Sequence, residues 1–133
     1  MSINLRKAAT LQEQIRQAIS DINLDNVLSG ELPNRLIRVE ELESVLYSLR
    51  DKVGKANVET GVSTLLTKRV QLNTLISRYE KLVRNGYEEY KLKLSDFRRE
   101  RVVISENILE LNVGSFVTLS NADLDILTNE NIL

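Results

Sequence analysis

The sequence of 133 residues contains neither cysteine nor histidine, and this double absence excludes several kinds of chemistry. Disulfides and thiolate nucleophiles need cysteine, the usual structural zinc sites need cysteine or histidine, and the common catalytic triads need histidine. A pair of carboxylates remains available for acid–base catalysis, but no spacing in the sequence singles one out. We therefore expect a protein that is not an enzyme and that binds no metal or cofactor.

Helix breakers and long hydrophobic runs are also scarce. Pro33 is the only proline, and the five glycines leave long windows free for helices. No uncharged apolar run approaches the roughly 20 residues that a membrane-spanning helix needs. The N-terminal residues lack the apolar segment and cleavage site of a secretory signal. With 42% hydrophobic and 28% charged residues, the composition is typical of one folded cytoplasmic domain.

Basic side chains are absent from the end of the chain. Residues 50–101 hold 13 basic and 7 acidic side chains, whereas residues 102–133 hold 5 acidic and no basic ones. We expect the acidic tail to attract the basic middle or a neighbouring subunit. A basic face for nucleic acid is the alternative.

The clearest helical pattern lies in residues 62–83, around which the rest of the chain is organised. Its row of apolar residues, interrupted by one arginine, steps alternately by three and four, as a helix packed against a partner requires. The row is formed by Val62, Leu65, Arg69, Leu72, Ile76, Tyr79 and Val83. Arg69 either binds an anion, pairs with an acidic residue of a neighbouring helix, or extends to the edge of the bundle.

Two further helices are expected before this one. Residues 3–22 and 39–53 show the same three–four rhythm, and residues 23–35 between them are rich in turn-forming residues. Gly54 and Gly61 bracket a predicted turn, which would make the second and third helices an antiparallel hairpin. The core that these helices predict consists of Leu11, Ile15, Ile22, Leu42, Leu46, Leu49, Leu65, Leu72, Ile76 and Tyr79.

The pattern changes after Gly86. Residues 90–94 alternate like a strand, although a helix over residues 87–97 fits as well. Residues 101–105, 108–113 and 115–120 are rich in β-branched or alternating apolar residues, which predicts a small antiparallel sheet. Ser120 begins a capping signal for a short terminal helix.

The predicted fold is therefore mainly α. It is a three-helix antiparallel bundle or long helical hairpin over residues 1–86, followed by a small β-containing C-terminal appendage over residues 87–133. We expect the two parts to form one cooperative domain.

Several short motifs in residues 3–84 resemble a family of small, all-helical bacterial proteins called septicolysin-like. The matching motifs are Leu5-Arg6-Lys7-Ala8-Ala9 with Leu11-Gln12, Gly30-Glu31-Leu32-Pro33, Ala56-Asn57 with Thr60, and Leu65-Leu66 with Lys68-Arg69. The resemblance implies a helical fold and brings no catalytic residues. The family is helical to its end, whereas residues 101–120 here have the pattern of strands. No long apolar hairpin supports the membrane lysis that the family name suggests.

Two functions fit the sequence. The first is a non-enzymatic assembly protein whose partner is itself or another protein, joined through helical seams and the C-terminal strands, because a small sheet is marginal unless it pairs or packs. The alternative is a module that binds an anionic ligand or nucleic acid through the basic residues 91–101, where aromatic residues lie between the charges. The candidate binding residues are Arg69, Lys91, Lys93, Arg98, Arg99 and Arg101.

Overall fold

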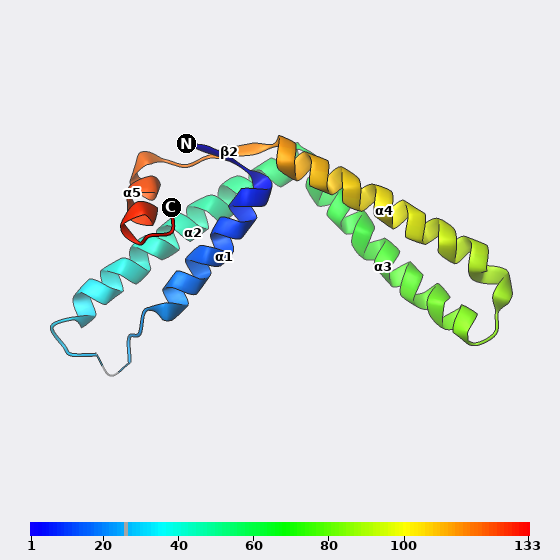
Figure 1. Cartoon of the computed structure of the whole chain (residues 1–133), viewed down its shortest axis with the longest axis horizontal. Coiled ribbons are helices and arrows are strands. Elements are labelled where there is room, and N and C mark those ends of the chain that lie inside the picture. The colour runs from blue at the N-terminus through cyan, green and yellow to red at the C-terminus, as the bar shows by residue number, and fades with distance from the viewer. Residues whose placement is uncertain (26) are drawn as a thin grey trace. The chain divides into compact units, whose positions relative to one another are not determined.

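Helices make up most of the chain in the computed structural model, which describes residues 1–25 and 27–133 (Figure 1). The predicted fold class, mainly α with a small β part, is confirmed. The helices among the described residues are α1 (Leu5–Asp21), α2 (Leu32–Glu59), α3 (Val62–Arg84), the 3₁₀ turn η1 (Glu88–Tyr90), α4 (Lys91–Gly114) and α5 (Asn121–Asn129). The strands are β1 (Ser2–Asn4) and β2 (Phe116–Thr118). Asn26, part of the predicted loop, lies outside the described residues.

Contacts divide the chain into two units. The terminal unit comprises Met1–Ala56 and Gly114–Leu133, and the hairpin unit comprises Asn57–Val113. The sequence had suggested a division at residue 86, but the turn at Gly86 lies within the hairpin unit. Each unit has its own cluster of buried apolar side chains.

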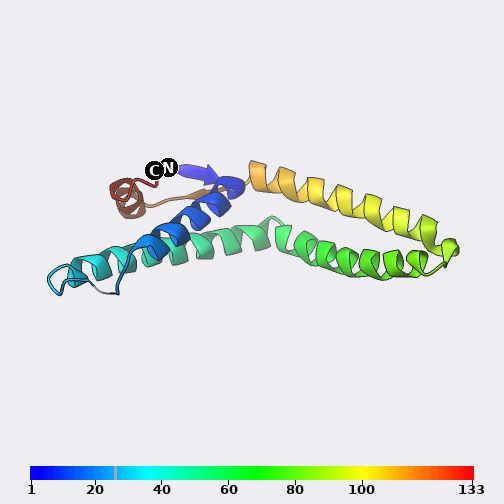
Figure 2. The same ribbon diagram turned by 60° about the horizontal axis from the view of Figure 1, so that its bottom comes forward.

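The terminal unit is built on α1 and α2, with the short α5 beside them (Figures 1 and 2). Its core contains side chains from α1, α2, the two strands and α5. Leu127 is the side chain of α5 that is fully buried in this core. The twelve buried members are Ile3, Leu5, Ala8, Leu11, Ile15, Leu42, Val45, Leu46, Leu49, Val117, Leu119 and Leu127. Ile132 also packs against this cluster.

The sheet of the terminal unit ties together the two ends of the chain. β1 and β2 run antiparallel, with Ile3 opposite Val117. Both of these side chains are buried, so one face of this small sheet covers the core. Asn4 then caps α1, because its side chain accepts a hydrogen bond from the Lys7 N–H at 2.8 Å.

The hairpin unit consists of α3 and α4, which are joined by a turn at Gly86 and by η1 (Figure 1). Gly86 has a φ of 95°, a left-handed conformation that glycine adopts at little cost. The core of the unit contains Val62 and Leu72 from α3 and Ile104 and Ile108 from α4. Two helices alone bury one stripe each, so this core is a single layer.

The second helix is longer than the sequence predicted. α2 begins at Leu32 rather than near residue 39, and Pro33 lies in its first turn, where the missing N–H leaves no hydrogen bond unmade. Gly54 lies inside α2, and the break predicted there occurs only at Gly61, where φ is 83°. The predicted hairpin of the second and third helices is also wrong: α2 contributes to the core of the terminal unit and α3 to that of the hairpin unit.

The strands predicted over residues 101–105 and 108–113 are wrong, because both segments belong to α4. The residues that face α3 follow a helical period. Leu94, Phe97, Arg101, Ile104, Ile108 and Leu111, all buried or half-buried, step by three and four residues. Burial of this stripe against α3 outweighs the local β preference of Val102 and Val103. The predicted strand over residues 115–120 is confirmed in β2.

Candidate functional site

The candidate binding residues of the sequence analysis all lie in the hairpin unit. Arg69 is on α3, and the other five are on α4. Within the unit, Lys91 and Arg98 line one hollow together, whereas the other four lie elsewhere. The predicted basic stretch is therefore spread around a helix instead of forming one patch.

The hollow lies between the end of α3 and the start of α4 and has a volume of about 580 Å³. It is lined by Glu80, Val83, Arg84, Lys91, Leu94 and Arg98. The Arg98 guanidinium donates a hydrogen bond to Glu80 at 3.0 Å, and Lys91 pairs with Glu88 at 2.5 Å. Arg84 has no ion pair among the described residues, so it is the one uncompensated cation of the hollow. This arrangement can hold a small anion between Arg84 and its neighbours.

An aromatic cluster joins the same helix ends, with Tyr79 from α3, Tyr90 from η1 and Phe97 from α4. The ring centroids of Tyr79 and Phe97 are 5.3 Å apart, and those of Tyr79 and Tyr90 are 5.5 Å apart. Lys93 lies over Tyr79, with its Nζ 5.3 Å from the ring centroid. The three rings are half-buried and pack on one another, so they stabilise the turn between the helices and do not present free faces for stacking bases.

The remaining candidate residues make separate contacts. Arg99 pairs with Asp96 at 2.5 Å, one helical turn earlier. Arg101 lies half-buried in the seam and donates to the Asn73 side chain at 3.2 Å. Arg69 is also half-buried, and the described part of the chain supplies no ion pair for it.

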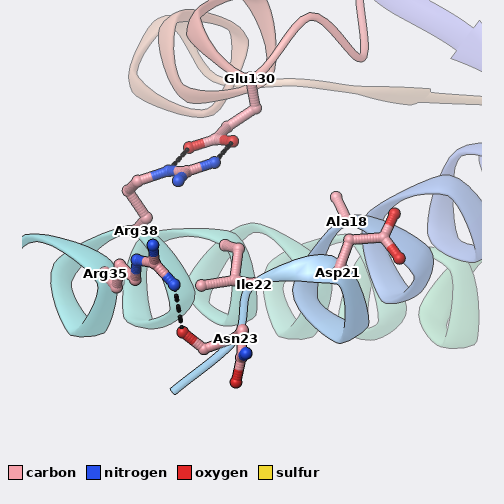
Figure 3. Close-up of a pocket in the computed structure, with 7 residues that line it drawn as sticks. All are labelled: Ala18, Asp21, Ile22, Asn23, Arg35, Arg38 and Glu130. Atoms are coloured by element: carbon pink, nitrogen blue, oxygen red, sulfur yellow. Dashed lines mark hydrogen bonds and ion pairs between the residues drawn. The ribbon is translucent and has the colours of Figure 1, made fainter. Parts of the chain in front are cut away.

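A second hollow lies in the terminal unit and was not found by sequence reasoning. It has a volume of about 370 Å³ and is lined by Ala18, Asp21, Ile22, Asn23, Arg35, Arg38 and Glu130 (Figure 3). Arg38 of α2 faces Glu130, the residue directly after α5, and the two form paired hydrogen bonds of 2.9 and 2.8 Å. Arg35 points toward the end of α1 and donates to the Asn23 carbonyl at 2.7 Å.

The electrostatics of this second hollow are dominated by the pair of Arg38 and Glu130. The hydrogen bonds from Arg38 lower the pKa of the Glu130 carboxyl, although partial burial opposes the shift. The same hydrogen bonds raise the pKa of Arg38. Because both charges are engaged with each other, the pair acts as a clamp that holds the end of α5 on α2. The sequence contained only a weak indication of this pair. The acidic residues 102–133 predicted a basic partner in residues 50–101, but Arg38 lies outside that range.

Two further properties of the described residues bear on function. No group of three or more histidine, cysteine, aspartate or glutamate residues among them is arranged to hold a metal ion. No helix among them is long and apolar enough to cross a membrane.

Comparisons with protein-family models, with curated proteins and with solved structures found no match. The resemblance to the septicolysin-like proteins stays a prediction.

Proposed function

We propose that this chain is a non-enzymatic assembly protein that associates with further copies of itself through the helices of the hairpin unit. The observation that carries the proposal is a row of exposed apolar side chains on α4, formed by Val102, Leu109 and Val113. Seven and four residues separate them, so at about 100° per residue they lie on one face of the helix. We call this set the α4 row.

The single-layer core of the hairpin unit supports the proposal. The buried stripe of α4 is used against α3, yet the α4 row leaves a second apolar stripe exposed on the same helix, with Val102 54% and Leu109 49% accessible. Apolar surface stabilises an association by roughly 25 cal/mol for each Å² removed from water. Packing the row against another helix would add a second layer to a thin core.

The C-terminal strands offer less surface for self-association than the sequence suggested. Residues 101–113 are helical, so β2 is the strand that remains from the predicted sheet. One edge of β2 already pairs with β1 inside the same chain. We therefore place the contact on α4.

The test is the solution mass of the full chain, measured by light scattering after size-exclusion chromatography. We expect a discrete oligomer for the wild type and dissociation for Val102→Glu. An unpaired charge buried in an apolar interface costs roughly 3 kcal/mol or more, which is about a hundredfold in dissociation constant.

Val103→Glu is the matched control. Val103 has the same side chain, the same 54% exposure and the adjacent position on α4, but it points about 100° away from Val102. It should leave the mass unchanged. A monomeric wild type at high concentration, or equal masses for the two variants, would contradict the proposal.

The alternative function is anion or nucleic-acid binding at the hollow of the hairpin unit, and the unpaired Arg84 is the observation that favours it. Titration of the chain with a single-stranded oligonucleotide at several salt concentrations tests it. If Arg84 contacts a phosphate, Arg84→Ala lowers the slope of log affinity against log salt by about 0.7. Arg78, an exposed arginine of α3 outside the hollow, provides the control variant Arg78→Ala. Equal slopes for both variants would remove the hollow as the binding site.

A further inference from the structure

We infer that the partner of the α4 row is the α4 row of a second copy, and that the two helices pair antiparallel. This inference rests on the proposed self-association and adds the partner element and its direction. It follows from how charge is distributed along the exposed side of α4.

Charges beside the α4 row change sign along the helix. At about 100° per residue, five charged side chains lie within about 80° of the direction of the row. The first half of α4 contributes Lys91, Arg98 and Arg99 to this set, and the second half contributes Glu106 and Glu110. The exposed side of α4 is therefore basic in its first half and acidic in its second half.

This polarity selects one direction of pairing. A parallel copy would place each basic half beside the other basic half and each acidic half beside the other acidic half. An antiparallel copy places opposite charges together. The pairing is isologous, as a two-fold symmetric dimer requires, because the same face of each copy is used.

The acidic half also lacks partners within the chain. Glu106 and Glu110 make no ion pair with any residue that the structure describes. The three basic residues of the set are each paired within the chain: Lys91 with Glu88, Arg98 with Glu80, and Arg99 with the exposed Asp96. Such exposed pairs one turn apart on a helix contribute little, so Arg99 can exchange Asp96 for a carboxylate of a second copy at small cost. The intramolecular pairs therefore do not compete strongly with the intermolecular ones.

A register follows from the positions of these groups. An antiparallel pair centred near residue 105 brings Val102 of one copy beside Leu109 of the other. The same register brings Arg99 beside Glu110 of the second copy, while the Glu106 side chains of the two copies lie near the two-fold axis. Apolar contact and opposite charge are thus satisfied by one alignment.

Disulfide cross-linking tests the direction, because the natural chain has no cysteine that could interfere. Val102→Cys and Leu109→Cys chains, carrying tags of different size, are oxidised separately and after mixing. Antiparallel pairing yields a cross-link mainly between the two different chains in the mixture. Parallel pairing yields cross-links mainly within each separate sample, and this result would overturn the inference while leaving self-association intact.

Charge exchange tests the register in the full chain. Arg99→Glu and Glu110→Arg should each weaken the dimer about tenfold, because two symmetric ion pairs become repulsive in each variant. The double variant R99E/E110R should restore most of the affinity. Two weakened single variants without restoration would overturn the inference, and a monomeric wild type would overturn both the inference and the proposed function.

Discussion

The pair of Arg38 and Glu130 gives a prediction whose size and pH dependence follow from its geometry. The substitution is Glu130→Gln, which keeps the shape of the side chain but removes its charge. The pair is bidentate, and the Glu130 side chain is only 15% exposed, while that of Arg38 is 50% exposed. A bidentate pair with one accessible partner lies toward the upper end of surface ion pairs, at about 1 kcal/mol. We expect the free energy of unfolding at pH 7 to fall by about this amount.

The sign of the pH dependence follows from the lowered pKa of Glu130. A carboxyl whose pKa is lower in the folded than in the unfolded state contributes stability above its unfolded pKa, which is about 4.3 for glutamate. That contribution is lost as the pH falls through the lower, folded value. The difference between wild type and Glu130→Gln should therefore be present at pH 7 and shrink steadily below about pH 4.

Urea denaturation followed by circular dichroism, at a series of pH values, measures both effects. Hydrogen exchange of α5 gives a local readout, since Glu130→Gln should speed exchange there. Asp51→Asn is the control, because the pair of Asp51 and Lys55 is exposed on both sides and its loss should cost less than about 0.5 kcal/mol. If Glu130→Gln matches the wild type at pH 7, or if its deficit is unchanged at pH 3, the clamp is not a stabilising ion pair.

Two other predictions concern stability. Leu127 is the fully buried side chain that α5 contributes to the core of the terminal unit. Leu127→Ala should lower the free energy of unfolding, measured by urea denaturation, by about 2–5 kcal/mol. Leu28 is exposed, so the control Leu28→Ala should change this free energy by less than about 0.5 kcal/mol. Gly86→Ala should destabilise the chain by about 1 kcal/mol, because alanine is strained at a φ of 95°. Gly54 lies within the last two turns of α2 with open space around it, so Gly54→Ala should stabilise the chain by about 0.5–1 kcal/mol. Thermal unfolding of the two glycine variants measures this contrast, and shifts of the same sign would contradict it.

The structure also explains why the basic stretch predicted from the sequence is not one site. In a helix, neighbouring positions point in different directions, so Lys93, Arg98 and Arg101 contact an aromatic ring, a carboxylate and an asparagine, respectively. A strand would have placed alternate members on one face. The sequence left a strand and a helix open over residues 87–97, and the helix that forms there disperses the basic side chains.

The sequence by itself determined the features that depend on local interactions. The three–four rhythm of residues 62–83 defined α3, the glycines at positions 61 and 86 marked its two ends through their positive φ, and Ser120 capped α5 by accepting from the Asp123 N–H. Seven of the ten predicted core residues are buried, because periodicity reports which face of a helix is apolar. Ile22, Leu65 and Tyr79 are half-buried beside the cores.

Only the tertiary structure decided which apolar faces meet. Periodicity does not reveal whether α3 shares its core with α2 or with α4, because both offer an apolar stripe of the same period. The β-branched residues 102–104 favour a strand locally, and burial of Ile104 and Ile108 against α3 made them helical. Arg38 and Glu130 lie 92 positions apart, and their pairing arises only when the core of the terminal unit brings α5 onto α2.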